Sequence, residues 1–388
     1  TGFRGGVDLS LKEFGFGIDG DVTFGKKGEV KYWFTKADAD VSAAKIMLFP
    51  PAVFVKSFSG GAYYHMNTPR FNNETVKLAS SKDYTPTDTV GLGLLAGLGV
   101  YFADDKLCSA NVEFEMNFND HWGVNYVGMK GIASILASLE KGDFKSKGKI
   151  GGTLETFYDR PNKTFHAEID ADVDFEKILS GNVNMQIHSD PKEWYCWMGT
   201  RSNPNSLNFV GLVDVSSYFM LGVIEKPMPL MIESVAAKLG FSSTTAAGQE
   251  EAISKGNGFA FGVKFEAEAE TSIPLDIIYA NFGLYAGTDL LVEESKCGRL
   301  DWRASGQAYV AADGCVGVTV YYPWWCKFYP CIKGKKIDIF NGSVLAALSG
   351  EVPAPARVSG KLGFKCSIIF INLPTIDVDV TVGEGCKK

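Results

Sequence analysis

The stretch Phe165–Phe175, which reads FHAEIDADVDF, decides the fold class. Apolar residues occupy every second position, and His166 or an acidic residue occupies each position between them. Successive side chains of a β-strand point to opposite faces, so this period of two predicts a strand with one apolar face and one charged face. Alternation this regular is typical of antiparallel sheets.

The same alternation recurs along the chain, at 111–118, 263–270 and 376–380. Polar turn sequences separate such runs, as at Asp159–Asn162 (DRPN) and Gly25–Gly28 (GKKG). We therefore predict an all-β fold class, mainly antiparallel, with long twisted sheets and a few short helices.

Helical periodicity is confined to two places. Apolar residues spaced i, i+3, i+4, i+7 begin at Ile132 and again at Ile232. They predict helices near 130–141 and 231–255, the second including a weaker helical stretch.

This mostly helical segment separates two strand-rich parts. It predicts an N-terminal β-rich domain at 1–226, a helical junction at 227–256 and a C-terminal, Cys-rich β domain at 257–388.

The alternation also predicts which side chains are buried, because the apolar face of a strand ordinarily packs into a core. The residues that we expect to be buried are Phe114, Met116, Phe165, Ile169, Val173 and Phe265. On the opposite face we expect exposed carboxylates at Glu168, Asp170, Glu266 and Glu268.

Composition excludes several classes of protein. Of 388 residues, 38 are Lys or Arg and 45 are Asp or Glu, which gives a net charge of −7. A nucleic-acid binder needs a cationic face, so we expect no nucleic-acid partner. Wholesale disorder is excluded by 46% hydrophobic and 21% charged residues. No run of 18 apolar residues predicts a transmembrane helix. The chain begins at Thr1 without a leader sequence, so we expect it to be processed or cut from a longer polypeptide.

The cysteines cluster near the C-terminal end. Six of the eight are disulfide candidates: Cys297, Cys315, Cys326, Cys331, Cys366 and Cys386. Their clustering predicts at least two disulfides and an oxidising compartment. The alternative is a set of reduced, buried thiols that pack as small hydrophobic groups. Zinc ligands are excluded by spacing, because no C-x-x-C pair occurs.

No catalytic signature is found. The chain has four His and no nucleophile, phosphate-binding or zinc-protease motif. The cluster Asp120-His121-Trp122 is the most site-like, although a loop His is more often a surface residue. Asp170–Asp174 lacks the Gly of a calcium loop, and His166-Ala-Glu168 lacks the second half of a deaminase motif. We therefore predict no catalytic, metal-binding or cofactor-binding residue, and no cofactor.

Two adjacent tryptophans are candidate contact residues. Trp324 and Trp325 cannot both point inward from one strand, because neighbouring side chains of a strand face opposite ways. One of them is therefore expected on the surface, where it would contact a partner.

Several phrases of the sequence resemble a known family. They include Lys31-Tyr32-Trp33, Gly60–Met66, Ser217–Gly222 and Gly258–Gly262, and they spread over nearly the whole chain. In these phrases the chain resembles part of very large, uncharacterised secreted surface proteins of the Bacteroidota. The resemblance implies an extracellular, β-rich segment at the cell surface, and it implies no activity.

These observations favour a non-enzymatic structural or adhesive module, a segment of a larger surface protein. Its expected partners are other segments of the same or a neighbouring surface protein, including copies of itself. One alternative is a carbohydrate-active or carbohydrate-binding β protein with paired carboxylates beside aromatic rings. Another is an outer-membrane β-barrel, in which the apolar residues would face lipid. Membrane insertion is not expected, because the chain has eight Cys and predicted helices.

Overall fold

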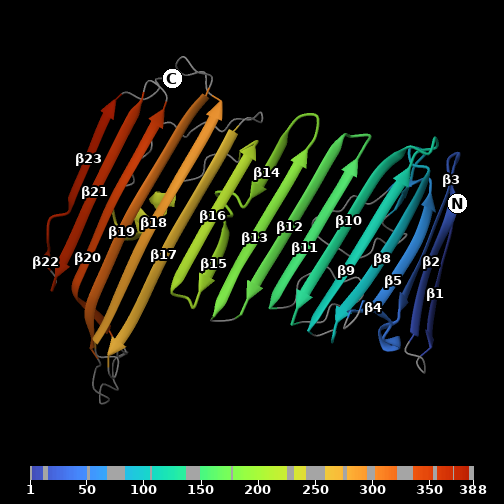
Figure 1. Cartoon of the computed structure of the whole chain (residues 1–388), viewed down its shortest axis with the longest axis horizontal. Helices are drawn as coiled ribbons and strands as arrows, with labels where there is room; N and C mark the ends of the chain where they lie inside the picture. The colour runs from blue at the N-terminus through green and yellow to red at the C-terminus, as the bar shows by residue number, and fades with distance from the viewer. Residues whose placement is uncertain are drawn as a thin grey trace, which may run out of the picture. The chain divides into compact units, whose positions relative to one another are not determined.

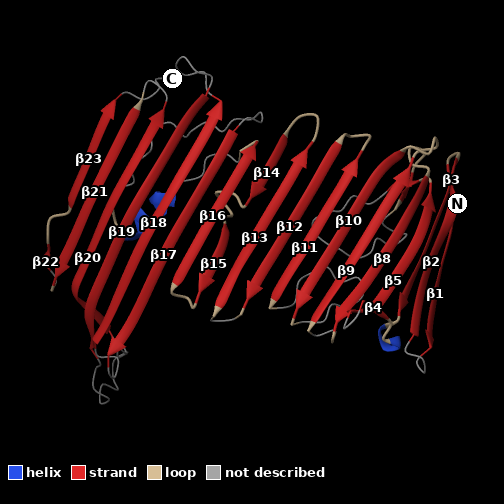
Figure 2. Cartoon of the chain, viewed as in Figure 1, coloured by secondary structure: helices blue, strands red, loops and turns tan. Residues whose placement is uncertain are grey.

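The computed structural model describes most of the chain. The described residues are 2–11, 16–49, 53–67, 84–104, 107–136, 149–175, 178–224, 231–241, 258–273, 278–294, 302–320, 335–352, 356–369 and 371–383. Nearly all of their regular structure is β-strand, and the strand pairings are antiparallel (Figures 1 and 2). The predicted all-β, antiparallel fold class is confirmed.

The chain divides into two compact units. The first comprises residues 1–175 and 182–196, and the second comprises residues 176–181 and 197–388. Except for β6 and β7, the strands are assigned to one antiparallel sheet, in which a strand pairs mainly with the next long strand along the chain. The part of it in each unit is called the first or the second sheet.

The first unit contains a sheet of strands that are mostly 10–12 residues long. They are β1 (Gly2–Leu11), β2 (Phe16–Lys27), β3 (Val30–Asp40), β5 (Val53–Tyr64), β8 (Leu92–Phe102), β9 (Cys108–Phe118), β10 (Val124–Ile135), β11 (Ile150–Asp159) and β12 (Thr164–Asp174). The short elements are η2 (Ser42–Ala44), β4 (Met47–Phe49), β6 (Met66–Asn67) and β7 (Thr85–Pro86). Strands β13 (Leu179–Ser189) and β14 (Trp194–Met198) are each divided between the two units.

Four strands of the second unit are longer, with 16–19 residues: β17 (Gly258–Ile273), β18 (Ile278–Glu294), β19 (Trp302–Val320) and β20 (Lys335–Val352). Its other strands are β15 (Asn205–Phe209), β16 (Val213–Gly222), β21 (Arg357–Ile368), β22 (Ile371–Asn372) and β23 (Ile376–Gly383). One helix, α1 (Met231–Leu239), packs on this sheet.

The helix predicted near 130–141 is wrong over the residues described. Residues up to Ile135 belong to β10, which pairs with β9 on one side and β11 on the other. Ile132 is buried on one face of that sheet and Ile135 is exposed on the opposite face. The residues whose spacing predicted a helix therefore belong to two different faces of a strand. Residues 137–148 lie outside the described part of the chain.

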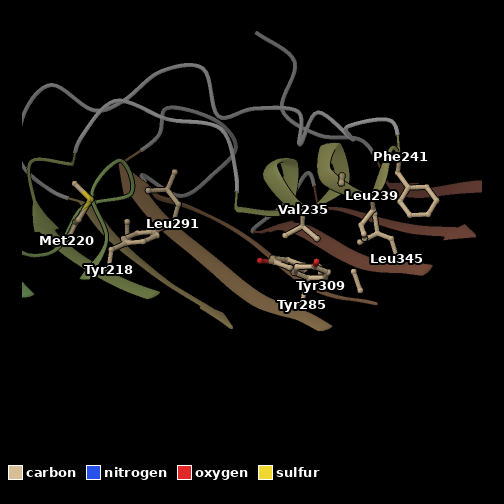
Figure 3. Packing of buried hydrophobic residues seen from close by; sticks show 12 residues of the cluster. Tyr218, Met220, Val235, Leu239, Phe241, Tyr285, Leu291, Tyr309 and Leu345 are labelled. Atoms are coloured by element: carbon tan, nitrogen blue, oxygen red, sulfur yellow. The ribbon is translucent and has the colours of Figure 1, made fainter. Parts of the chain in front are cut away.

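The helix predicted from 231 is confirmed as α1, which Gly240 follows with a φ of 73°. The buried side chains of Val235, Ala236 and Leu239 face the sheet and pack with residues such as Leu345 (Figure 3). Residues 242–257, which hold the weaker helical stretch, are outside the described residues.

Strands β16 and β17 flank this helix in the sequence and pair directly with each other. The helical segment is therefore an insertion between two neighbouring strands of one unit. The domain limits expected at 226 and 256 stay a prediction.

The predicted burial of the apolar strand residues is wrong. Phe114, Phe165 and Ile169 are exposed, and Met116, Val173 and Phe265 are only half-buried. The expected exposure of carboxylates is met by Asp170 and Glu268, whereas Glu168 and Glu266 are half-buried. The physical reason is that no second sheet covers the apolar face within the described part of either unit.

The cysteine and tryptophan candidates are only partly described. Cys315 and Cys366 are free thiols, as are Cys108 and Cys196, so neither of the first two forms its predicted disulfide. Cys315 lies opposite Asn341 and Cys366 lies opposite Gly342, so the register does not bring the two thiols together. The other candidates lie outside the described residues: Cys297, Cys326, Cys331, Cys386, Trp324 and Trp325. None of the described helices is both long enough and apolar enough to cross a membrane.

Candidate functional site

The first sheet presents a continuous apolar face. Register places Phe3 beside Phe24, Phe24 beside Trp33, and Trp33 beside Tyr64, so aromatic rings form a row at one end of the strands. The rings of Phe3 and Phe24 lie 5.2 Å apart, and those of Trp33 and Tyr64 lie 6.5 Å apart. We call this set the aromatic row.

Beyond the aromatic row the same face remains apolar from strand to strand. Leu94, Leu98, Val112, Phe114 and Ile169 project from it and are all exposed. Within the described residues, no Asp, Glu, Lys or Arg occupies this face between the aromatic row and the opposite strand ends. At the corner near η2, Ala39, Val41 and Val55 are buried in a small cluster of their own.

The second sheet repeats the arrangement over longer strands. One register row places Leu284, Ala312, Val344, Phe364 and Ile376 side by side across five strands. The next row is equally apolar and consists of Ala286, Val310, Ala346, Leu362 and Val378. The side chains of Val310 and Leu348 are 57% and 58% exposed, which is the degree expected of an uncovered face.

We refer to these two surfaces as the apolar faces and to the opposite surfaces as the polar faces. The polar faces carry the charged residues of the strands and are more deeply buried, as Glu115, Lys130 and Asp289 show. The polar faces also hold buried hydrophobic clusters, such as Leu345 with Leu239 and Phe34 with Tyr63, so charged residues are buried beside apolar ones.

Tyrosines on the polar faces lie over glycines. A Cβ added to Gly93 would lie 2.0 Å from the ring of Tyr63, and one added to Gly262 would lie 2.3 Å from the ring of Tyr218. The absence of a side chain at these glycines lets the flat rings lie down on the sheet. The rings therefore shield the backbone and keep their hydroxyls within reach of neighbouring carboxylates.

In the first unit these hydroxyls converge on Glu115. Tyr63 donates a hydrogen bond of 2.6 Å to Glu115 Oε1, and Tyr84 donates a second one of 3.3 Å. Asn117 Nδ2 donates to the Tyr63 oxygen at 3.1 Å. Burial and the nearby carboxylate raise the pKa of Tyr84, so its hydroxyl stays protonated as a donor.

The second unit has a comparable network around Asp289. Tyr218 donates to Asp289 Oδ1, and Arg201 Nε donates to the Tyr218 oxygen at 3.0 Å. The Arg201 guanidinium also lies 3.6 Å from Asp289, and Gln307 donates to the second carboxylate oxygen at 3.3 Å. Burial raises the pKa of the Tyr218 hydroxyl. The two carboxylate oxygens of Asp289 thus accept hydrogen bonds from Tyr218 and Gln307, whereas the buried Arg201 Nη2 has no hydrogen-bond partner among the described residues.

Glu113 is a carboxyl group of the first polar face whose ionisation is opposed by its surroundings. Desolvation raises its pKa to about 7, despite the partial compensation from the cations Lys36 and Lys130. Those cations are engaged elsewhere as well, since Lys130 Nζ lies 3.2 Å from Glu155 and Lys36 Nζ lies 3.7 Å from Asp38.

A row of rings crosses the first unit on its polar face. His166 lies between Phe157 and His188, and His188 stacks on Tyr195 at 5.2 Å between ring centroids. His166 Nε2 is 3.6 Å from Glu168, and this hydrogen-bonding partner lowers the pKa of that carboxyl. Gln186 also donates to Glu168 at 2.8 Å. The arrangement links neighbouring strands and presents no nucleophile.

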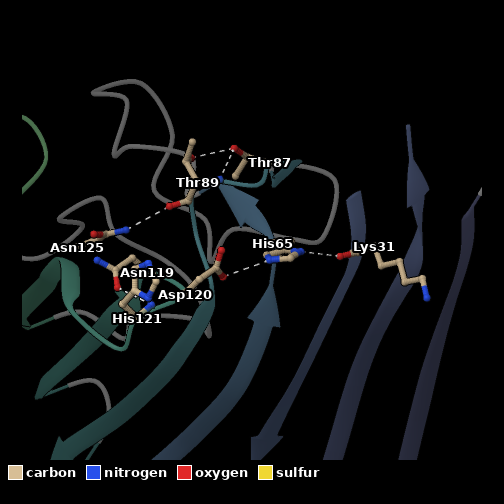
Figure 4. Close-up of polar contacts among 8 residues, drawn as sticks. All are labelled: Lys31, His65, Thr87, Thr89, Asn119, Asp120, His121 and Asn125. Atoms are coloured by element: carbon tan, nitrogen blue, oxygen red, sulfur yellow. Dashed lines mark hydrogen bonds and ion pairs between the residues drawn. The ribbon is translucent and has the colours of Figure 1, made fainter. Parts of the chain in front are cut away.

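The loop that holds Asp120 and His121 is linked to a neighbouring strand end through His65 (Figure 4). Asp120 Oδ1 lies 3.4 Å from His65 Nε2, and His65 Nδ1 lies 3.0 Å from the carbonyl oxygen of Lys31. Both nitrogens of His65 thus already face an acceptor. The sequence could not reveal this pair, because 55 residues separate its members.

The same loop is shaped by Asn119. Its side-chain oxygen accepts hydrogen bonds from the backbone N–H groups of His121 and Gly123, each at 2.9 Å. Trp122 has a φ of 61° and is exposed. These contacts are those of a polar turn, in which an Asn side chain replaces backbone hydrogen bonds. The contacts of Asp120-His121-Trp122, the cluster that most resembled a functional site in the sequence, are therefore explained by the structure of a turn.

No group of three or more metal-ligating side chains is found among the described residues. Comparison with models of known families, with curated proteins and with solved structures gives no match. The feature that distinguishes this chain is thus its pair of exposed apolar faces. The alternation that predicted the strands also predicted which residues form these faces. It did not indicate that the faces are exposed.

Proposed function

We propose that this chain is a non-enzymatic structural or adhesive module of a cell surface, acting through its two apolar faces. The observation that carries the proposal is the exposure of these faces over many neighbouring strands, illustrated by Val310 and Leu348. Large apolar patches on a protein surface mark sites of contact with other molecules. Uncovered surface of this kind favours association, because its burial releases water.

The polar faces support a structural role in the same way. Their carboxylates are occupied by tyrosines, amides and cations within the protein, as around Glu115 and Asp289. A reactive group in an enzyme must instead meet a substrate. In this proposal the polar networks hold the strands in register and the apolar faces make the external contacts.

The proposed location is extracellular, at the cell surface. It is supported by the resemblance to very large secreted surface proteins of the Bacteroidota, and the proposed partners include other segments of such a protein. Four of the six candidate cysteines lie outside the described residues, so disulfides among them remain a prediction.

A dye that fluoresces on apolar protein surface, 8-anilinonaphthalene sulfonate, tests the proposal. We expect the folded chain in detergent-free buffer to bind the dye, and Val310→Gln with Leu348→Gln to lower the emission. The control pair is Ser349→Ala with Ser359→Ala, which changes polar-face residues of β20 and β21. Circular dichroism checks that each variant is folded.

Two results would contradict the proposal. One is a folded wild-type chain that binds no dye, which would mean that the apolar faces are covered within the chain itself. The other is a chemical turnover by the purified chain that is lost when a single carboxylate, such as Glu113, is changed to its amide.

A further inference from the structure

We infer that the apolar faces are covered by the acyl chains of a lipid membrane. The inference rests on the proposed function, but it replaces protein segments with lipid as the contact of these faces and departs from the expectation that the chain does not insert into a membrane. Three features of the apolar faces carry it: the lack of charge, the poverty in hydrogen-bonding groups, and the order of aromatic and basic residues at one end of the first sheet.

The first feature is the lack of charge. In the second sheet, the described apolar-face residues of β20 and β21 run through Val344, Leu348, Val358 and Phe364 without one charged side chain. Charged groups of the same strands, such as Lys361, project from the polar face. A charge in contact with hydrocarbon costs several kcal/mol. Away from the strand ends this face avoids that cost, and Glu294, which pairs with Trp302, is a charged residue at one such end.

The second feature is the small number of hydrogen-bonding side chains on the apolar faces. The polar side chains on the described apolar faces, away from the strand ends, are hydroxyls such as Thr35, Thr156 and Thr288. A protein interface ordinarily makes about one hydrogen bond for each 100–200 Å². Acyl chains require none, so they fit this surface better than a protein partner does.

The third feature is the order of residues at the end of the first sheet. Lys26 pairs with Lys31 one step beyond Phe24 and Trp33 on the same face. Both lysines are exposed, and Lys26 Nζ lies 2.9 Å from Glu29 Oε2. Aromatic rings followed by basic side chains match the boundary between acyl chains and anionic head groups. A turn farther along repeats the order, with Tyr158 beside Phe165 and the exposed Lys163 next to them.

Flotation with vesicles tests the inference on the full chain. The probe is a set of large unilamellar vesicles of phosphatidylcholine with one quarter phosphatidylglycerol, mixed with protein diluted from mild detergent. We expect the wild-type chain to float with the vesicles. The double variant Val310→Lys with Leu348→Lys should bind at least about tenfold more weakly, because both changes put charge against hydrocarbon.

The matched control is Val210→Lys with Leu212→Lys. These apolar residues are also exposed but lie at the turn between β15 and β16, away from the apolar face. The control should float like the wild type. A second pair, Lys26→Gln with Lys31→Gln, should weaken binding to the anionic vesicles, by roughly fivefold for Lys31 and by less for Lys26, whose charge Glu29 partly compensates. It should leave binding to pure phosphatidylcholine unchanged.

Three outcomes would overturn the inference. The wild-type chain could remain unbound, the apolar-face variant could float as well as the wild type, or the chain could form a discrete dimer that excludes vesicles. Dye binding separates this failure from failure of the proposed function. A chain that binds the dye without floating retains exposed apolar faces but does not use them for lipid.

Discussion

The two faces of each sheet differ in a way that period-two alternation alone does not explain. In the second sheet, Leu345 and Leu348 lie on the same strand, yet Leu345 is 0% exposed under α1 and Leu348 is 58% exposed. The polar face is closed by α1, tyrosine rings and ion pairs. The apolar face has no such cover among the described residues. The comparison teaches that the packing that stabilises this fold lies on its polar face, and that the apolar face is exposed for the contacts proposed above.

The largest test of this comparison is a matched pair of leucine truncations. Leu345→Ala should lower the free energy of unfolding by about 2–5 kcal/mol, because it leaves a cavity in a packed cluster. Leu348→Ala should change it by about 0.5 kcal/mol or less, because its side chain is mostly in solvent. Denaturant unfolding in detergent-free buffer measures both. Equal losses would mean that the apolar face also packs against protein.

A smaller effect is expected from matched glycines. Gly93→Ala should destabilise the fold by about 1–3 kcal/mol, because the new Cβ would overlap the ring of Tyr63. Gly60→Ala is the control, since the nearest atom to its added Cβ, the Leu95 carbonyl oxygen, is 4.0 Å away. Thermal unfolding distinguishes the two. A neutral Gly93→Ala would show that the tyrosine need not lie on the strand.

A further effect depends on pH and concerns Glu113, whose folded-state pKa is raised to about 7 from a usual 4.5. Between these values the folded chain retains a proton that the unfolded chain has lost. This group's contribution to stability is therefore complete below about pH 4.5 and is lost as the pH rises to about 7. Glu113→Gln should thus become progressively more stable than the wild type over this window.

Melting temperatures at pH 4.5, 6 and 8 measure that difference. Glu29→Gln is the control, because Glu29 lies at the turn between β2 and β3 with its side chain 96% exposed. A difference between Glu113→Gln and the wild type that does not vary with pH would place the Glu113 carboxyl in water.

The sequence was sufficient to predict strands with regular alternation, such as β9, β12 and β17, and the segregation of their side chains. Alternation shows which residues share a face, as with Phe165 and Ile169, but it carries no information about what covers that face. The helix expected from Ile132 failed for a related reason. Gly131 and Ala133 weaken the apolar alternation of β10, and the remaining isoleucines coincide with a helical spacing.

The candidate site was harder to predict because its parts come together only through pairing. The tyrosine networks join Tyr63 to Glu115 and Tyr218 to Asp289 across 52 and 71 residues. No local motif marks such pairs. The glycines beneath the rings, Gly93 and Gly262, were visible in the sequence, but their role depends on which tyrosine the register brings over them.

The order of the strands has a consequence for how each sheet is made. Nearly every long strand pairs with the preceding long strand, as β18 pairs with β17 and β19 with β18. A strand that forms later in the chain can therefore pair with the edge of a strand that has already formed. Growth by successive additions keeps the loops that must close short, which favours rapid assembly. Its disadvantage is an exposed edge strand at the growing end of the sheet. The unpaired N–H and C=O groups of that edge can pair with the wrong strand before the correct strand forms. A chain extruded gradually, in order, would limit that hazard.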